Sequence, residues 1–142
     1  MEAYGMAGHL IRRLHQISTQ VFMARMRDAG IDVTQVQFAA MDAIRANPGV
    51  DQASVAALIA YDRATIGGVI DRLVSKGYVA RTVSDRDRRA REVQLTAEGA
   101  RLFDDLLPLV RGLQDEILSK LTPAERETFV ALAHKTINNN AT

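Results

Sequence analysis

A length of 142 residues, a formal net charge of +1 and the absence of cysteine set the first limits on this chain. The length suits a single domain of roughly 100 to 150 residues, and the sequence lacks the about 18 to 20 consecutive apolar residues of a membrane span, so we expect a soluble protein. Without cysteine there are no disulfides, thiolate ligands or cysteine nucleophiles, and His9, His15 and His134 are too scattered for a metal motif, so we expect no metal and no cofactor.

The first helix is predicted from about Gly5 to Asp28, and Gly30 ends it. Its apolar residues recur at helical spacing, which indicates one buried face; they are Leu10, Leu14, Ile17, Val21 and Phe22. The first fifteen residues contain charged side chains and no sustained apolar run. They do not resemble a secretory signal, so we expect a cytoplasmic protein.

A second helix is predicted to begin after Thr34, because Thr34 and Gln37 have the spacing of a capping box. Its buried face would carry Phe38, Met41 and Ile44. The segment Asn47-Pro48-Gly49 should end this helix.

Two shorter helices are predicted over 52–59 and 63–75, because Asp51 and Asp62 can cap their first turns. Only Ala60 and Tyr61 separate the first helix from Asp62, the cap of the second, so the two helices must turn sharply against each other. This spacing is typical of a helix-turn-helix.

A β-hairpin is predicted after Gly77, which should end the fourth helix, with strands over 78–82 and 92–96. The segment SDRDRRAR between the strands is too charged to be buried. Residues 63–91 hold eight basic and three acidic side chains, although the whole chain is nearly neutral. Such a cluster can attract the phosphates of a DNA duplex; the alternative is a solvated surface that binds nothing.

A long helix is predicted from Thr96, its cap, to about Leu121, with a kink at Pro108. A last helix should begin at Thr122-Pro123-Ala124-Glu125, which combines an N-cap, a proline at the first helical position and a capping-box glutamate. We expect the Asn138-Asn139-Asn140 tail to fray. The expected buried faces are Leu102, Leu106, Leu109, Leu113 and Ile117 on the first of these helices, and Phe129, Leu132, Ala133 and Ile137 on the second.

The apolar faces of the terminal helices exceed what a small helix-turn-helix core needs to cover itself. This surplus favours a dimer interface, and packing within one chain is the alternative.

The chain resembles the MarR family of transcriptional regulators along nearly its whole length. The segment VAALIAYDRATIGGVIDRLVSKGYVAR is similar to the recognition segment of that family, and DRRA followed by VQLT is similar to its wing and to the entry to its long dimerisation helix. The resemblance implies a mainly α fold with a small β-hairpin, a winged helix-turn-helix, forming a single domain over 1–142. Residues 34–96 would form the DNA-binding lobe, with dimerisation helices over 1–30 and 97–142.

The first turns of the predicted recognition helix suggest which residues contact bases. An arginine can bond guanine bidentately and a threonine can contact thymine, so Arg63 and Thr65 are the candidates; first-turn capping is the alternative for Thr65. Gly67 and Gly68 depart from the family pattern, in which larger polar side chains are common. They allow close approach to DNA but remove two groups that read bases.

Phosphate contacts are expected from residues around the recognition helix. Arg72 faces differently from Arg63 and suits a phosphate, or an ion pair with Asp85 or Asp87 as the alternative. Gln52 and Ser54, at the start of the third helix, can position the protein on the backbone. In the wing, Arg86, Arg88 and Arg89 should contact DNA; by the family pattern Arg89 enters the minor groove, and Asp87 orients a neighbouring arginine.

The resemblance also implies a small effector, often aromatic or anionic, between the dimerisation helices and the DNA-binding lobe. The expected binding residues are His9, Arg12, Arg13, Gln16, Phe38 and Met41. Arg12 or Arg13 would anchor the carboxylate of an aromatic acid or its thioester. The alternative for the polar residues of the first helix is exposure to solvent or salt bridges between chains.

These features together predict a ligand-responsive, homodimeric DNA-binding regulator, a repressor of a pseudo-palindromic operator, and not an enzyme. No phosphate-binding glycine loop, metal cluster or catalytic triad stands out in the sequence. The alternative function is a winged helix that binds proteins without specific DNA binding.

Overall fold

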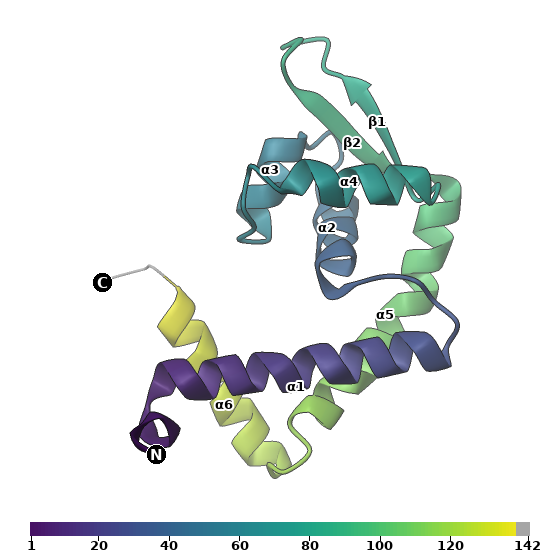
Figure 1. Cartoon of the computed structure of the whole chain (residues 1–142). Helices are drawn as coiled ribbons and strands as arrows, with labels where there is room; N and C mark the ends of the chain where they lie inside the picture. Colours follow the sequence, from purple (N-terminus) through teal and green to yellow (C-terminus); the bar gives the residue numbers. More distant parts are fainter. Residues whose placement is uncertain (139–142) are drawn as a thin grey trace.

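The computed structural model describes residues 1–138 and is mainly helical, with one antiparallel hairpin (Figure 1). In Figure 1, α1 and α6 lie at one end, α2, α3, α4 and the hairpin lie at the other, and α5 connects the two ends. The winged-helix order of elements agrees with the prediction. The elements are η1 (Glu2–Gly5), α1 (Ala7–Asp28), α2 (Gln35–Ala46), α3 (Gln52–Leu58), α4 (Ile66–Ser75), β1 (Val79–Val83), β2 (Arg91–Leu95), α5 (Ala97–Ile117) and α6 (Pro123–Ile137).

The helix starts predicted at Thr34, Asp51, Thr96 and Thr122 are confirmed. Thr34 and Thr122 each form a complete capping box, with Gln37 and Glu125 respectively. The Asp51 carboxylate accepts a hydrogen bond from the Ser54 amide at 2.7 Å at the start of α3. Thr96 caps α5 as expected, whereas Asp62 does not cap α4.

The prediction that α4 begins at Arg63 was wrong, because α4 begins at Ile66. Asp62 accepts a hydrogen bond from the Ala64 amide at 2.9 Å, and the Thr65 hydroxyl donates to the Asp62 carbonyl at 3.1 Å. These local bonds hold residues 63–65 in a turn instead of a helix. Arg63 and Thr65 therefore precede α4, the predicted recognition helix.

The end of α4 is a Schellman motif, as expected for Gly77. Gly77 has a φ of 82°, and its amide donates to Val74 O at 3.0 Å while the Tyr78 amide donates to Leu73 O at 3.0 Å. The left-handed conformation suits glycine. The chain then enters β1, whose residues pair with β2 from Val79↔Leu95 to Val83↔Arg91.

The first turn of α5 is seated on the connection between α4 and β1. Thr96 caps α5 by accepting from the Gly99 amide at 3.0 Å, and its hydroxyl donates to Gly77 O at 2.6 Å. The Thr96 amide donates to Tyr78 O at 3.1 Å. A Cβ atom added to Gly99 would lie 2.0 Å from that same carbonyl oxygen. Only glycine fits at this position.

The core has two clusters of buried apolar residues, one among α2, α3, α4, the hairpin and the start of α5, and one between α1 and α5. Phe38 of α2 packs against both. Its ring stacks on Phe103 with centroids 5.3 Å apart and lies 6.5 Å from the ring of Phe22. The two clusters therefore form a continuous apolar core through α2.

The terminal helices depart from the expected burial. On α5, Leu106 and Leu113 are buried as predicted, but Phe103 and Val110 are buried as well and Leu109 is exposed, so the buried face is rotated slightly from the predicted one. The helix runs through Pro108 without a break. No residue of α6 is buried in this single chain, and Leu132 and Ile137 are 57% and 70% exposed. The expected buried side of α6 is therefore wrong for one chain.

An exposed apolar surface remains at this end of the molecule; it includes Tyr4, Met6, Ile11, Val130, Leu132 and Ile137. The last two asparagines of the expected frayed tail lie outside the described residues. None of the helices between residues 1 and 138 has the length and apolar character needed to cross a membrane.

Candidate nucleic-acid interface

The hairpin is fixed beside the start of α3 by contacts between their backbones. The Val93 amide of β2 donates to Val50 O at 2.9 Å, and Asp51 forms a β-bridge with Glu92. A cleft of about 510 Å³ lies between α3, the turn before α4 and the wing. It is lined by Asp51, Gln52, Ala53, Arg63, Ile66, Asp87, Arg89, Ala90 and Arg91.

The cleft brings together three of the predicted DNA-binding residues, Gln52, Arg63 and Arg89. Three guanidinium groups line it, and both of its carboxylates are engaged in local hydrogen bonds. Bonds from the Ser54 amide hold the pKa of Asp51 below its ordinary value, which keeps that carboxylate charged as the cap of α3. The arginines are thus the groups available to an anionic ligand such as a phosphate.

The wing loop is organised by its own hydrogen bonds. The hydroxyl of Ser84, a buried residue, accepts from the amides of Arg86 and Asp87 at 3.2 and 3.3 Å. The Asp87 carboxylate accepts from the Arg89 amide at 3.0 Å and forms an ion pair with Arg89 Nε at 3.6 Å. The expected orienting role of Asp87 is therefore supported by geometry. The Arg89 side chain is 94% exposed, and Asp87 holds it both at the backbone amide and at Nε.

The other predicted contact residues lie on exposed surface outside the cleft lining: Ser54, Thr65, Gly68, Arg72, Arg86 and Arg88. Within residues 1–138 no ion pair joins Arg72 to Asp85 or Asp87, so the alternative for Arg72 is wrong in this structure. Its neighbour Asp71 instead pairs with Arg81 at 2.7 Å.

Two arginines of the site were not singled out from the sequence. Arg81 of β1 donates to Gln52 Oε1 at 3.1 Å and pairs with Asp71, so it ties α3 and α4 to the wing. Arg91 lines the cleft and donates to Arg88 O at 3.1 Å. Both lie within residues 63–91, the segment rich in basic residues, but no spacing rule distinguished them from the other arginines of that segment.

The two glycines of α4 lie in different surroundings. A Cβ on Gly67 would lie 3.3 Å from Gln52 Nε2, whereas a Cβ on Gly68 would meet nothing within 4 Å. Gly67 therefore accommodates the Gln52 side chain between α3 and α4. Gly68 leaves open surface on α4.

We expect Gly68→Ala to stabilise the protein by up to about 1 kcal/mol, because alanine favours helix over glycine and the site has room. Gly67→Ala should gain less, since Gln52 must move. Urea unfolding followed by circular dichroism measures both variants. Equal gains would show that Gln52 places no restriction on position 67.

The predicted effector residues are not brought together within one chain. Met41 is fully buried, and Phe38 lines an open groove of about 400 Å³ between α2 and α3. Arg13 lies on α1 nine residues before Phe22, the α1 residue beside Phe38, which is a rise of about 14 Å along the helix.

The remaining three effector candidates lie still nearer the start of α1 or beside Arg13. Arg12 and Gln16 are exposed, while the ring of His9 is half-buried against Tyr4 at 5.4 Å. Within one chain, the α1 candidates and Phe38 therefore do not line one common site.

The family model described as MarR family matches residues 31–90, the span from the linker before α2 to the wing. The HTH-type transcriptional repressor NicR of Pseudomonas putida is 32% identical over 133 residues, which cover 94% of this chain and 83% of that one.

Solved structures of regulators share the whole fold. BpsR of Bordetella bronchiseptica, whose DNA binding is regulated by 6-hydroxynicotinic acid, has a TM-score of 0.86 at 30% identity, covering 95% of each chain. A variant of MarR from Escherichia coli complexed with operator DNA has a TM-score of 0.82 at 28% identity, covering 92% of this chain and 93% of that one. These relatives are regulators and not enzymes. The match extends over both the DNA-binding lobe and the terminal helices, and this chain belongs to the MarR family of transcriptional regulators.

Proposed function

We propose that this chain is a homodimeric repressor that binds a pseudo-palindromic operator and releases it when a small aromatic or anionic effector binds. The observation that carries the DNA-binding part is the cleft, in which Arg63 before the recognition helix and Arg89 of the wing face the same space beside α3. A recognition helix in the major groove with a wing arginine in the adjacent minor groove explains this placement.

The dimer is supported by the exposed apolar surface of η1, α1 and α6. Large side chains such as Ile11, Leu132 and Ile137 are more than half exposed in one chain. An apolar surface of this kind is typical of an interface. A two-fold dimer would place two recognition helices about 34 Å apart, which matches successive major grooves.

The effector part rests on the groove beside Phe38 and on the basic residues of α1. We propose that in the dimer α1 of one protomer lies against the groove of its partner, and that Arg12 or Arg13, both exposed, anchors a carboxylate there. BpsR, which is regulated by 6-hydroxynicotinic acid, supports an aromatic acid as the effector class.

The test is a gel shift with DNA that flanks the protein's own gene, repeated over a salt titration. We expect specific binding that weakens steeply with salt and is lost on adding an aromatic acid such as 6-hydroxynicotinate. Arg13→Ala should abolish the response to the acid and leave DNA binding in place. Binding that never exceeds that to unrelated DNA would instead favour a winged helix that binds proteins.

A further inference from the structure

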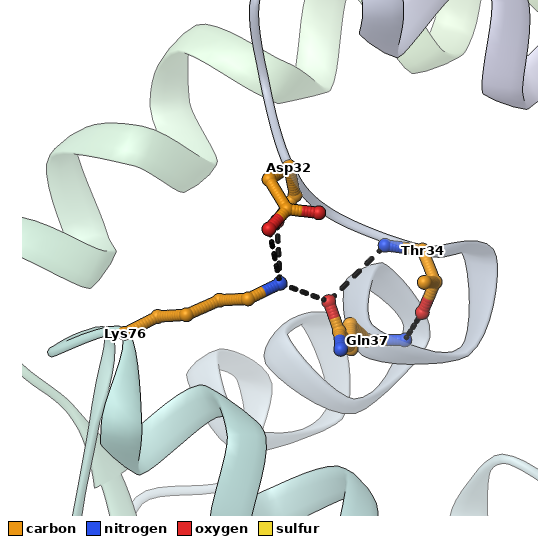
Figure 2. Close-up of polar contacts among 4 residues, drawn as sticks. All are labelled: Asp32, Thr34, Gln37 and Lys76. Carbon is orange, nitrogen blue, oxygen red and sulfur yellow. Dashed lines mark hydrogen bonds and ion pairs between the residues drawn. The ribbon is translucent and has the colours of Figure 1, made fainter.

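The linker between α1 and α2 meets the far end of the recognition helix through one lysine. Lys76 is the C-cap of α4, and its Nζ donates to Asp32 O at 2.6 Å and to Gln37 Oε1 at 3.0 Å. The Asp32 carboxylate lies 3.4 Å from the same nitrogen (Figure 2). Three acceptors from the linker and α2 therefore surround a single ammonium group of α4.

The contact is partly shielded from water and uses an atom that already caps α2. Gln37 is 3% exposed, and the Lys76 side chain is 24% exposed. Gln37 Oε1 also accepts from the Thr34 amide at 3.2 Å, as Figure 2 shows. The start of α2 and the end of α4 thus share one oxygen. Because the ammonium is charged, its bonds are stronger than those between neutral groups.

The linker that Lys76 contacts is also held against α1. The Ile31 amide donates to Met26 O at 2.8 Å, and Val33 is buried in the cluster between α1 and α5. Any displacement of α1 relative to the DNA-binding lobe must move the linker that Lys76 holds.

Lys76 lies at the opposite end of α4 from the cleft. Ile66, which lines the cleft, is ten residues earlier, or about 15 Å along the helix. Lys76 therefore does not line the cleft that is proposed to face DNA, although it is one of the basic residues of the segment 63–91.

We propose that Lys76 is a positioning residue for operator binding: it fastens the recognition helix to the segment that continues from α1, and so fixes the separation of the two recognition helices in the dimer. This inference rests on the proposed DNA-binding function. Under this proposal, Lys76 determines which spacing between half-sites the dimer prefers, and Lys76 does not contact a phosphate.

The test compares Lys76→Met, which keeps the aliphatic chain and loses the donors, with Lys120→Met, which removes the same charge from an exposed lysine outside this contact. Affinity is measured for the wild-type operator and for operators with one base pair added or removed between half-sites, each over a salt titration. We expect Lys76→Met to bind the natural spacing about tenfold more weakly, the scale of one charge-assisted hydrogen bond, and to lose much of its preference among spacings. Its salt slope should equal that of the control.

A phosphate contact predicts the opposite pattern. If Lys76→Met lowers the salt slope by about one and keeps the wild-type spacing preference, the positioning role is overturned.

A second measurement needs no DNA. Amide hydrogen exchange over residues 31–37 should be faster in Lys76→Met than in wild type and in Lys120→Met. An unchanged rate of amide exchange in Lys76→Met would overturn the proposal that Lys76 holds the linker. Wild-type protein that binds no specific operator would overturn the proposed function, while the exchange measurement still decides whether Lys76 holds the linker.

Discussion

Replacing Gly99 with alanine is expected to destabilise the protein by about 3 kcal/mol or more, the upper range for overpacking a core. The added Cβ would lie 2.0 Å from Tyr78 O and 2.8 Å from its carbonyl carbon. Both are backbone atoms, so no rotamer change relieves the clash. Either α5 must lift from the connection between α4 and β1, or that connection must shift.

The matched control is Gly112→Ala in the same helix, where an added Cβ meets nothing within 4 Å. Because alanine favours helix, this variant should be more stable than wild type by up to about 1 kcal/mol. Urea unfolding midpoints of the two variants measure the difference. A Gly99→Ala protein within 1 kcal/mol of wild type, on the order of an ordinary surface change, would contradict the packing described.

Arg89→Ala is expected to weaken operator binding by roughly ten- to a hundredfold and to lower the salt slope by about one. The side chain is exposed, lines the cleft and forms an ion pair with Asp87. Fluorescence anisotropy over a salt titration measures both quantities. Arg111→Ala, which removes an exposed charge on α5, serves as the control.

A companion variant, Asp87→Ala, separates orientation from overall charge. Removing a carboxylate near DNA should tighten binding if only net charge matters. We expect weaker binding instead, because the Arg89 amide and Nε lose their acceptor. Tighter binding by Asp87→Ala would show that Asp87 does not orient Arg89.

The sequence predicted those features that depend on neighbours three or four residues apart. The capping boxes at Thr34 and Thr122 and the stop at Gly77 are of this kind. The start of α4 was misplaced because Asp62 forms its bonds in a turn, and a capping aspartate and a turn aspartate look the same in sequence.

Contacts between distant segments could not be predicted in this way. Lys76 and Gln37 are 39 residues apart, and Arg81 and Gln52 are 29 apart, so no helical or strand period connects them. The face of α6 was also misjudged, since Leu132, Ala133 and Ile137 are exposed in a single chain and Phe129 is only half-buried. Burial that depends on a second chain leaves the same periodic pattern as burial within one chain.

Ser84 and Asp87 hold the wing loop through bonds within the loop itself, which use no group from outside the chain. A loop that is already ordered loses little conformational entropy when it enters a groove. Coupled folding of the wing should therefore add little to the heat-capacity change of binding. Differences in affinity among operators would then arise mainly from the work of narrowing or bending each DNA sequence to accept a rigid hairpin.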